Sequence, residues 1–437
     1  MSASDVSKYE EVLLESSNGS DSVDLRLGVQ SIDYFEDIFS PTITAKIVVT
    51  TTGDAVNGKS IVQGLPCRGG ERLSLRIAGN AAGMPGLDFS DKEKYFYVSG
   101  VSNVISTNQR ESFVLNLYSR EAITNETARV PKKFPTSAPI SVSAEDIIKT
   151  YLQTSKKIDV DKSMNKYGFI GNMRKPFTVL TWLASKAVPE TKGNGTAGYC
   201  FFETKSGFKF RSLDSLIGSN SKATYIANDV VNEDGLKQDY TIVEYAINRN
   251  QNVLENLRLG VYSSFRSYFN PVNFAFTHPE KGVFKMDDYI NNTKNLGEKF
   301  EFPPISEESE LTLGDVPTRL LTGVLDLGTQ EVGVSTARNA DALLYQSQAL
   351  FRYNTLFTQQ VTATLPCNTN LEAGDVIECL FPETTTKKKK EYDQMQSGLY
   401  MIKELRHHFD PNGSYTCLLY TSPSPRDQRG SRMPSSA

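Results

Sequence analysis

The chain has 437 residues, 39% of them hydrophobic, with 23 Phe, 20 Tyr and a single Trp. This length and composition fit two to four globular domains with substantial cores and exclude disorder of the whole chain. The formal net charge of −4 leaves no surplus of cations, which argues against a protein that grips nucleic acid, although DNA could pass close to it.

Targeting signals are absent from the sequence pattern. The first twenty residues contain no apolar stretch of signal-peptide length, and nowhere do eighteen apolar residues run together. We therefore expect a soluble protein with no integral membrane segment. The cysteines show no C-x-x-C spacing, which favours small buried thiols in a reducing compartment. They are Cys67, Cys200, Cys367, Cys379 and Cys417.

The N-terminal quarter of the chain is typical of a β-sheet. Short alternating segments are separated by Gly, Asn, Asp and Ser clusters, a spacing typical of a sandwich or barrel. The predicted strands are VDLRLGV (23–29), ITAKIVVTT (43–51), RLSLRIAG (72–79), KYFYVSGVSNVIS (94–106) and SFVLNLYS (112–119). The basic, Pro-containing segment RVPKKFPTSAP (129–139) then predicts a domain boundary.

Two helices and a hairpin are predicted next. Ser143, with Asp146 three residues later, forms a near capping box at the start of AEDIIKTYLQT. Pro176 can open a second helix, FTVLTWLASKAV, whose apolar residues share one face. The segment YCFFETKSGFKFRS (199–212) predicts a hairpin that turns at Lys205-Ser206-Gly207.

The second half of the chain returns to strands. Segments near 222–231 and at 239–251 are expected to complete the first sheet, and short aromatic-rich strands with an acidic loop are expected from 253 to 330. A helix is predicted at 338–350. After it, LEAGDVIECLFPE (371–383) and GLYMIKELRHHFDPNGSYT (398–416) alternate as paired antiparallel strands of a small barrel do.

The last residues form a separate case. From Cys417 the alternation is expected to stop, and CLLYTSPSPRD (417–427) resembles translated read-through of a sequencing-library adaptor. The alternative is a disordered tail rich in Ser, Pro and Arg. We expect the natural sequence to end near Thr416 and residues 417–437 not to be native.

Motifs that carry chemistry are weak. Gly193, Gly195 and Gly198 spell G-x-G-x-x-G, but the loop follows a helix and enters a strand, the reverse of a dinucleotide site. His407 and His408 are adjacent and on a strand would point to opposite faces, so they cannot easily share a metal ion. No nucleophile motif is present. No catalytic residue, metal or cofactor is therefore expected.

Charged clusters are expected to lie on solvated loops. None of the acidic clusters follows the D-x-D-x-D-G pattern of a calcium loop. The basic run Lys387–Lys390 is either a solvated loop or a contact with an acidic neighbour or passing DNA. The acidic clusters are Asp159/Asp161, Asp287/Asp288 and Glu307/Glu308/Glu310; the remaining histidine is His278.

Three segments, in order, resemble one known family. One pattern resembles the final β-barrel of the baseplate hub protein of contractile-tailed bacteriophages, T-even-like phages and cyanophages included. It consists of L-x-x-G-D-V-I, then Y-x-I-x-x-L-x-H, then Y-T. The same barrel recurs in the spike hubs of type VI secretion systems. Residues 31–77, with their G-x-P-x-x-G-G-E step, resemble the family's first barrel, and residues 175–218 resemble its helix-then-hairpin module.

The resemblance implies an α+β, mainly β fold. Two similar small antiparallel β-barrels and two peripheral α/β modules would form a trimeric pseudo-sixfold ring. The implied domains are a first barrel at 1–125, completed by about 222–252, a helix-hairpin module at 126–221, a second peripheral module at 253–335 and a second barrel at 336–416.

The implied function is that of a structural virion protein and not an enzyme. A hub of this family joins the sixfold tail tube to the threefold spike and leaves a channel for DNA. The implied partners are two further copies, the cell-puncturing spike, tube or tube-initiator proteins and baseplate wedge proteins, in the virion and, during assembly, in the host cytoplasm. The family-motif positions, with packing and turn roles, are Gly69, Gly70, Glu71, Gly374, Asp375, Tyr400 and His407.

Alternatives remain open. The contractile assembly that contains this hub could be a tailocin or a secretion apparatus. A wall hydrolase would need converging carboxylates in a cleft. A host-glycan-binding module would need an exposed aromatic platform, although core packing is the commoner use of such rings. The rings concerned are Tyr262, Phe265, Tyr268, Phe269, Phe274 and Phe276.

Overall fold

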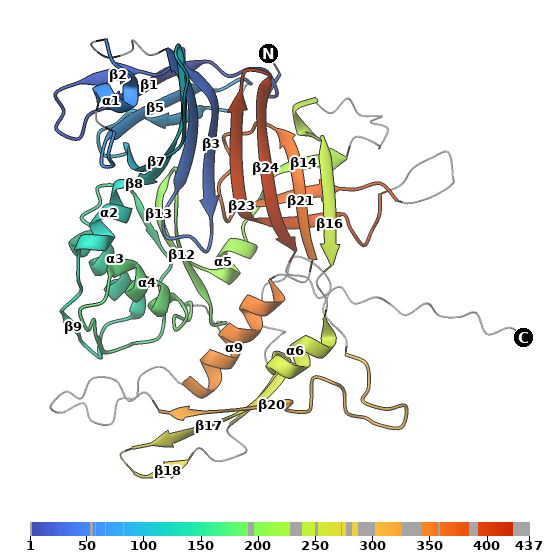
Figure 1. Cartoon of the computed structure of the whole chain (residues 1–437). Coiled ribbons are helices and arrows are strands. Elements are labelled where there is room, and N and C mark those ends of the chain that lie inside the picture. The colour runs from blue at the N-terminus through green and yellow to red at the C-terminus, as the bar shows by residue number, and fades with distance from the viewer. Residues whose placement is uncertain are drawn as a thin grey trace, which may run out of the picture.

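The computed structural model has a mainly β fold with a few helices. Strands from both halves of the chain lie side by side in one large sheet, and most helices lie below it in the view of Figure 1. No described helix is long and apolar enough to cross a membrane. The described residues are 2–52, 56, 58–65, 67–81, 83–190, 196–227, 238–249, 252–271, 273–276, 282–286, 302–325, 342–356, 359–383 and 392–422.

The N-terminal half of the sheet runs in the order β2-β1-β5-β7-β8-β4-β3, and β6 pairs with β5. Alternating apolar residues such as Ile47 and Val49 face the core, as the sequence pattern predicts. The elements are β1 (Tyr9–Glu15), β2 (Ser22–Asp24), β3 (Val29–Asp37), β4 (Thr44–Thr52), α1 (Ile61–Gly64), β5 (Arg72–Ala78), β6 (Gly86–Phe89), β7 (Phe96–Ser106) and β8 (Arg110–Ser119).

The strand predicted over 23–29 is wrong. The chain turns after Asp24, whose carboxylate accepts hydrogen bonds from the Arg26 backbone N–H and guanidinium, and Gly28 N–H donates to Leu25 O at 2.8 Å. Local side-chain bonds of this kind compete with strand pairing. The next strand, β3, therefore begins at Val29.

The C-terminal half supplies the rest of the sheet. β23 pairs with β22 and β24, β24 pairs with β21, and β14 runs parallel to β22. The elements are β14 (Ser221–Ala227), η1 (Gln238–Tyr240), β15 (Thr241–Ile242), β16 (Glu244–Arg249), β21 (Gln359–Pro366), β22 (Val376–Leu380), β23 (Gly398–Asp410) and β24 (Gly413–Ser422).

Two expectations about this half need correction. β14 and β16 pair with β22 and β21, not with the strands that precede residue 125, because apolar alternation does not say which part of a sheet a strand joins. In addition, β24 continues past Thr416, and Leu418 and Tyr420 are buried, so alternation does not stop at Cys417. The origin of residues 417–437 stays a prediction.

The two halves form one sheet and not two separate barrels. β3 pairs with β4 on one side and with β23 on the other, which makes a continuous 15-stranded sheet. A single hydrophobic cluster includes residues of both halves, from Val12 to Tyr420. The halves therefore share a core as well as a sheet.

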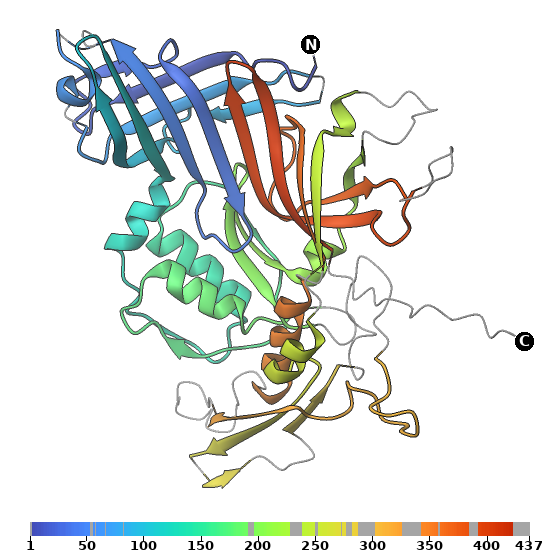
Figure 2. The ribbon, with the colours of Figure 1, turned by 45° about the vertical axis from the view of Figure 1, so that its right-hand side comes forward.

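The helix-hairpin module packs against the sheet from below and has a core of its own (Figures 1 and 2). The hairpin is confirmed, and the second helix begins at Pro176 as predicted. The first helix begins at Ile140, so Ser143 lies inside it and does not cap it. The elements are α2 (Arg120–Thr127), β9 (Lys133–Phe134), α3 (Ile140–Tyr151), β10 (Ile158–Val160), β11 (Phe169–Ile170), α4 (Pro176–Ala184), β12 (Tyr199–Thr204), β13 (Gly207–Ser212) and α5 (Leu213–Ile217).

A smaller four-stranded sheet lies at the lower end of the molecule, and helix α9 runs from it up to the large sheet (Figure 1). The predicted helix at 338–350 is confirmed by α9 over the part of that range that the structure describes, and it extends to Thr355. The elements are α6 (Val253–Leu259), β17 (Ser263–Asn270), β18 (Ala275–Phe276), β19 (Val283–Lys285), β20 (Arg319–Val324) and α9 (Ala342–Thr355).

Candidate functional site at the junction of the halves

Strands β3 and β23 join the two halves near the middle of the sheet (Figure 1). Their antiparallel register pairs Tyr34 with His407 and Phe35 with Arg406. Because successive side chains of a strand point to opposite faces, Tyr34 and His407 lie in the core, whereas Phe35 and Arg406 lie on the outer face. The junction thus has an apolar inner side and a polar outer side.

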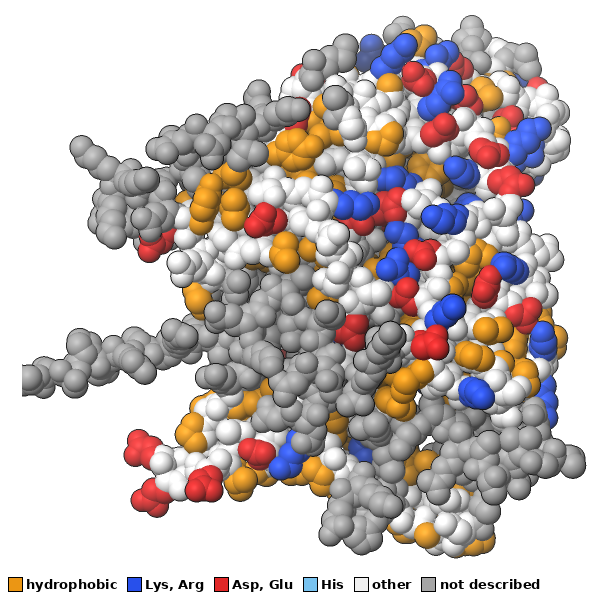
Figure 3. All heavy atoms as spheres, turned by 180° about the vertical axis from the view of Figure 1, so that it is seen from behind, with side chains coloured by type: hydrophobic (Ala, Val, Ile, Leu, Met, Phe, Trp, Pro, Cys, Tyr) orange, Lys and Arg blue, Asp and Glu red, His pale blue; other side chains and the backbone are white. Residues whose placement is uncertain are grey.

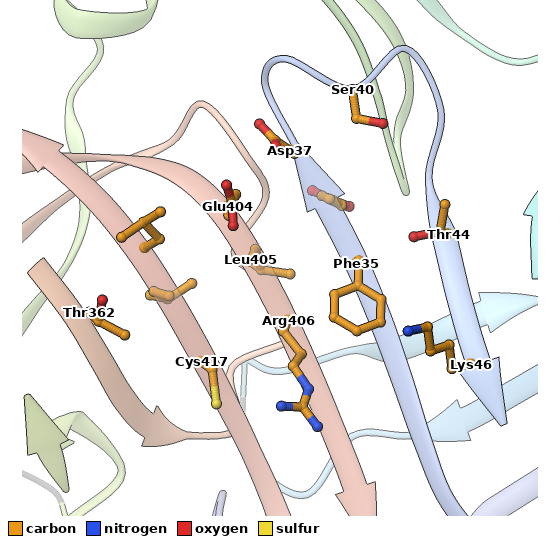
Figure 4. Close-up of a pocket in the computed structure, with 13 residues that line it drawn as sticks. Phe35, Asp37, Ser40, Thr44, Lys46, Thr362, Glu404, Leu405, Arg406 and Cys417 are labelled. Carbon is orange, nitrogen blue, oxygen red and sulfur yellow. The ribbon is translucent and has the colours of Figure 1, made fainter. Parts of the chain in front are cut away.

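A shallow groove of about 490 Å³ follows the outer side of the junction. Its side chains come from strands of both halves, as Figure 4 shows. Apolar atoms and charges of both signs line it together, and the carboxylates of Asp37 and Glu404 lie close enough to interact. Lining residues include Phe35, Lys46, Thr362, Glu404, Arg406 and Cys417.

A charged ladder crosses the junction on this outer side. Arg406 Nε donates to Asp33 Oδ1 at 2.8 Å, and His408 Nδ1 lies 2.6 Å from the same oxygen. A half-buried bidentate or networked pair is more stabilising than an isolated exposed one. Asp33 from one half therefore holds two side chains of the other.

His407 is buried on the inner side. Its Nδ1 lies 2.9 Å from Thr416 Oγ1, and its ring stacks on Tyr34 with centroids 6.0 Å apart. Burial, helped by the Lys205 ammonium, lowers the pKa of His407 to about 3, so the imidazole is neutral at physiological pH. His407 and His408 point to opposite faces, which supports packing roles and not a shared metal site.

The tip of the β12–β13 hairpin inserts below the junction and contacts both halves. Lys205 N–H donates to Glu36 Oε1 at 2.8 Å, and the Tyr34 hydroxyl donates to the same oxygen at 2.7 Å. Ala373 N–H, from the other half, donates to Glu36 Oε2 at 2.8 Å. One carboxylate thus connects the N-terminal half, the C-terminal half and the module.

Burial and the neighbouring Glu372 raise the pKa of Glu36 to about 7. Glu372 behaves in the opposite way. Burial opposes its ionisation, yet the Lys209 ammonium, 2.6 Å from Oε2, holds the pKa of Glu372 at about 2. Lys205 Nζ lies 3.8 Å from Glu372 Oε1 and donates to Thr369 O and to Leu371 O. The junction therefore contains a buried group of two carboxylates and two ammonium groups.

The predicted motif positions of the N-terminal half form a turn. Glu71 is buried and accepts hydrogen bonds from the backbone N–H groups of Arg68 at 2.8 Å and Gly69 at 3.0 Å. Gly69 and Gly70 have φ of 104° and 91°, a region that favours glycine. These contacts support a turn role for the three positions.

The predicted positions of the C-terminal half lie close to the junction. Gly374 has φ of 88°, and a Cβ there would lie 3.1 Å from Leu216. Asp375 Oδ2 accepts from Glu372 N–H at 2.8 Å, and the buried Tyr400 hydroxyl accepts from Gln359 Nε2 at 2.6 Å. No hydrogen bond between described residues joins this group to the Gly69–Glu71 turn. Their status as family positions stays a prediction.

The Asp159/Asp161 cluster does not form the solvated loop that was expected, because Asp159 lies in β10 and both carboxylates are paired. Asp159 and Asp161 pair with Arg211 at 2.8 and 3.0 Å. Among the described residues, no group of His, Cys, Asp and Glu side chains is arranged to hold a metal ion. Asp287, Asp288, His278, Lys387–Lys390, Gly193 and Gly195 lie outside the described residues.

The aromatic residues of the lower sheet divide into two groups. Tyr262 is 6% exposed and packs in a small core, as expected. Phe274 and Phe276 are 79% and 68% exposed, which differs from the expected packing of these rings. They contact Phe269, with centroids 6.1 and 5.4 Å away.

Sequence analysis missed Glu36 and Glu372 as partners in the junction. Each stands in a strand or loop with an ordinary pattern, and the bonds that define them join residues more than 160 positions apart. The only available signal was the inward register of Glu36, which follows Ile32 and Tyr34 on the buried face of β3.

The fold is that of phage tail proteins. A tail protein from Neisseria meningitidis MC58 matches with a TM-score of 0.52 and 11% identity, over 95% of this chain and 98% of that one. A 43 kDa tail protein of prophage MuSo2 from Shewanella oneidensis matches with a TM-score of 0.51, at the same identity and coverage. No protein-family model matches the sequence.

A sequence relative makes the class more specific. The chain is 21% identical over 350 residues to the protein named probable baseplate hub protein gp334 of Vibrio phage KVP40. The match covers 76% of this chain and 77% of the phage protein. The predicted resemblance to phage baseplate hub proteins is therefore confirmed.

Proposed function

We propose that this chain is a structural hub of a contractile phage tail baseplate. The observation that carries the proposal is the similarity to a baseplate hub protein along three quarters of the chain. The tail-protein fold, matched over 95% of the chain, supports it. The junction adds a physical reason, because its buried contacts fix the two halves in one orientation.

In this proposal the two halves of the fused sheet take the place of the two predicted barrels in one ring subunit. β15 and β16 flank the single residue Val243 and pair with β14 and β21, which brings the strands of the C-terminal half round toward one another. Three copies with two such halves each would form a pseudo-sixfold ring around a channel. Such a ring can seat a sixfold tube on one side and a threefold spike on the other, because a cyclic ring has two different faces.

The proposed partners follow from that position. They are two further copies of the chain, the cell-puncturing spike, tube or tube-initiator proteins and wedge proteins, with DNA only in passage. The protein would act in the virion and assemble in the host cytoplasm. Its mechanism would be one of shape and interface area and would make or break no bonds.

Experiments can distinguish the hub function from alternative functions of the same fold. The hub could serve a tailocin or a secretion-type contractile machine. A host-glycan-binding role is favoured by one observation, the exposed pair Phe274 and Phe276, since stacking on a sugar needs exposed rings. Binding on a glycan array, lost in a Phe274→Ala/Phe276→Ala variant, would support that second role.

The test of the hub is the solution mass of the full chain, measured by size-exclusion chromatography with light scattering over a range of concentrations. We expect a trimer. Obligate rings bury large apolar interfaces and stay assembled on dilution. A chain that is monomeric at every concentration contradicts a ring that forms without its spike.

A further inference from the structure

Charge is distributed unevenly along the chain. The helix-hairpin module, residues 126–221, contains 15 Lys and Arg but only 8 Asp and Glu, although the whole chain has a net charge of −4. The segment 302–318 between β19 and β20 contains four acidic residues and no basic one. The molecule therefore carries a basic part and an acidic part.

The basic charge of the module gathers around β9 and β11, which pair antiparallel so that Lys133 lies opposite Ile170. Bridges place Arg174 beside Val130 and Lys166 beside Pro139. We call the resulting surface the basic face and define it by Lys132, Lys133, Lys166, Arg174 and Lys186. Of these, Lys132 pairs with Asp146 at 2.7 Å.

The basic face rests on a rigid aromatic layer. Phe134 and Phe169 stack with centroids 4.4 Å apart, and Phe169 meets Trp182 edge-on at 5.5 Å. Lys186 Nζ lies 5.4 Å from the Trp182 ring. A surface held in this way loses little conformational entropy when it binds a partner.

Apolar side chains stand among these cations. Ile170 is 47% exposed and Met173 is 60% exposed. Met173 occupies a tight turn with φ of 56°, beside Gly171, where a Cβ would lie 2.3 Å from Val130 O. An uncommon backbone conformation thus presents an apolar side chain to solvent, which is typical of recognition surfaces.

Segment 302–318 is an ordered acidic projection. Pro304 bridges Thr312, and Ile305 N–H donates to Leu311 O at 2.9 Å, so the chain forms a hairpin-like loop. Ile305 and Leu311 are 47% and 51% exposed. Glu307, Glu308 and Glu310 are exposed at and beside the turn. We call these five residues the acidic tip.

The basic face and the acidic tip lie on opposite sides of the molecule. In Figures 1 and 2, β9 is on the left and the gold-coloured loop between β19 and β20 extends to the right. From behind, red side chains cluster on a projection at the lower left, and the right-hand side carries blue, red and orange side chains together (Figure 3). One copy cannot bring these two surfaces together.

We propose that the acidic tip of one copy docks on the basic face of the next copy. The inference rests on the proposed ring and names a contact that would hold it together. Each surface has exposed apolar residues with charges around them, and the charges are of opposite sign. A contact between two different surfaces of identical subunits is heterologous, and such contacts form a ring when the rotation between copies closes, as it would in the proposed trimer.

A second copy fits better than an unrelated acidic partner. Both surfaces belong to the same chain, so they occur in equal number at every concentration. Contacts between unlike surfaces also leave no tip and no face unused in a closed ring. A dimer in which either surface pairs with its own copy would instead bring like charges together.

The experiment is a charge swap in the full chain. The tip variant carries Glu307→Lys, Glu308→Lys and Glu310→Lys, and the face variant carries Lys133→Glu, Lys166→Glu and Arg174→Glu. Mass by light scattering and dissociation on dilution are measured for each variant alone and for the combined variant. All six residues are exposed, so folding should be retained, and circular dichroism checks this.

We expect each single-surface variant to dissociate at a protein concentration on the order of tenfold higher than the wild type, or more, because attraction becomes repulsion at several charge pairs. The combined variant should recover most of the loss. Added salt should weaken the wild-type assembly and strengthen that of each single-surface variant.

A matched control reverses three exposed carboxylates elsewhere, with Asp21→Lys, Asp91→Lys and Glu93→Lys, and should assemble as the wild type does. If the wild type is a trimer and the tip and face variants assemble as it does, this contact is overturned, whereas the proposed hub is not affected. A combined variant that stays dissociated also overturns it. A wild type that is monomeric throughout contradicts the proposed ring itself, which is a distinguishable result.

Discussion

Glu36 is the residue at which the three parts of the chain meet. It is 1% exposed, and its three hydrogen-bond donors come from β3, the module hairpin and the loop before β22. Burial of a carboxylate costs several kcal/mol unless charges and donors compensate for it. The charged groups around it are Lys205 and Glu372, with the neutral His407 behind Tyr34.

Glu36 should make stability depend on pH. The folded-state pKa of about 7 lies above the ordinary glutamate value of 4.5, so the folded protein binds this proton more tightly than the unfolded chain does. The resulting stabilisation is complete below about pH 4.5 and is lost as pH rises through 7. We expect the unfolding free energy of the wild type to fall by on the order of 3 kcal/mol across that range relative to Glu36→Gln.

Urea unfolding at several pH values between 5 and 8 measures this difference. Glu36→Gln will also lose a hydrogen bond, because its amide N–H₂ faces donors, but that loss shifts the curve without changing its slope. The exposed Glu93→Gln change is the control. If the unfolding free energies of Glu36→Gln and the wild type change with pH in the same way, Glu36 does not titrate in this range.

Residue-level roles were only partly predictable. The opposite orientation of His407 and His408 was predictable because successive strand residues face opposite ways, whereas the packing role of His407 was implied by the family resemblance. The role of Glu36 was not predictable, because its partners Lys205 and Ala373 are far away in the chain and only the tertiary fold brings them together. Turn glycines such as Gly374 were predictable because their backbone requirement is local.

At the scale of elements, β24 is the strand on which the C-terminal half depends. It pairs with β21 from Tyr415 to Ser422 and with β23 on its other side. Leu418 and Tyr420 place their side chains in the shared core. The strand is thus central to its half and not a disposable edge.

A chain that ends at Thr416 should be much less stable than one that ends at Ser422. The shorter chain loses two buried side chains and leaves the pairing groups of β21 and β23 exposed, which should lower the unfolding free energy by at least about 4 kcal/mol. Removal of 423–437 alone should change it by less than about 0.5 kcal/mol. Urea unfolding compares the three chains, and equal midpoints for the chains ending at Thr416 and Ser422 would contradict the packing of β24.

Elements with strong local signals were predicted well. The 199–212 hairpin and the helix at Pro176 follow from turn chemistry and proline geometry. The segment 23–29 was mistaken for one strand because its alternation hides the Asp24–Arg26 turn. Helix α3 begins before Ser143 because tertiary packing of Ile140 outweighs a near capping box.

For the whole molecule, the shared sheet has a mechanical consequence. The sequence indicated two β-rich ends but not their fusion, because nothing in the local sequence of β3 or β23 predicts that these two strands pair. Once fused, the halves have one core, so neither can open without exposing apolar surface of the other. A subunit that behaves as one rigid body would suit a ring that must hold two different symmetries in register.

The fused sheet should unfold as a single cooperative unit. Ile47→Ala in β4 and Leu365→Ala in β21 remove fully buried side chains from opposite halves, and each should destabilise the protein by about 2–5 kcal/mol. Hydrogen exchange measured by mass spectrometry should then accelerate for the slowest amides of both halves in each variant, because these amides exchange only through global opening. Faster exchange confined to the mutated half would show two separate units and would remove the physical argument for a rigid subunit. Ala substitution of the exposed Leu27 is the control and should leave both halves unchanged.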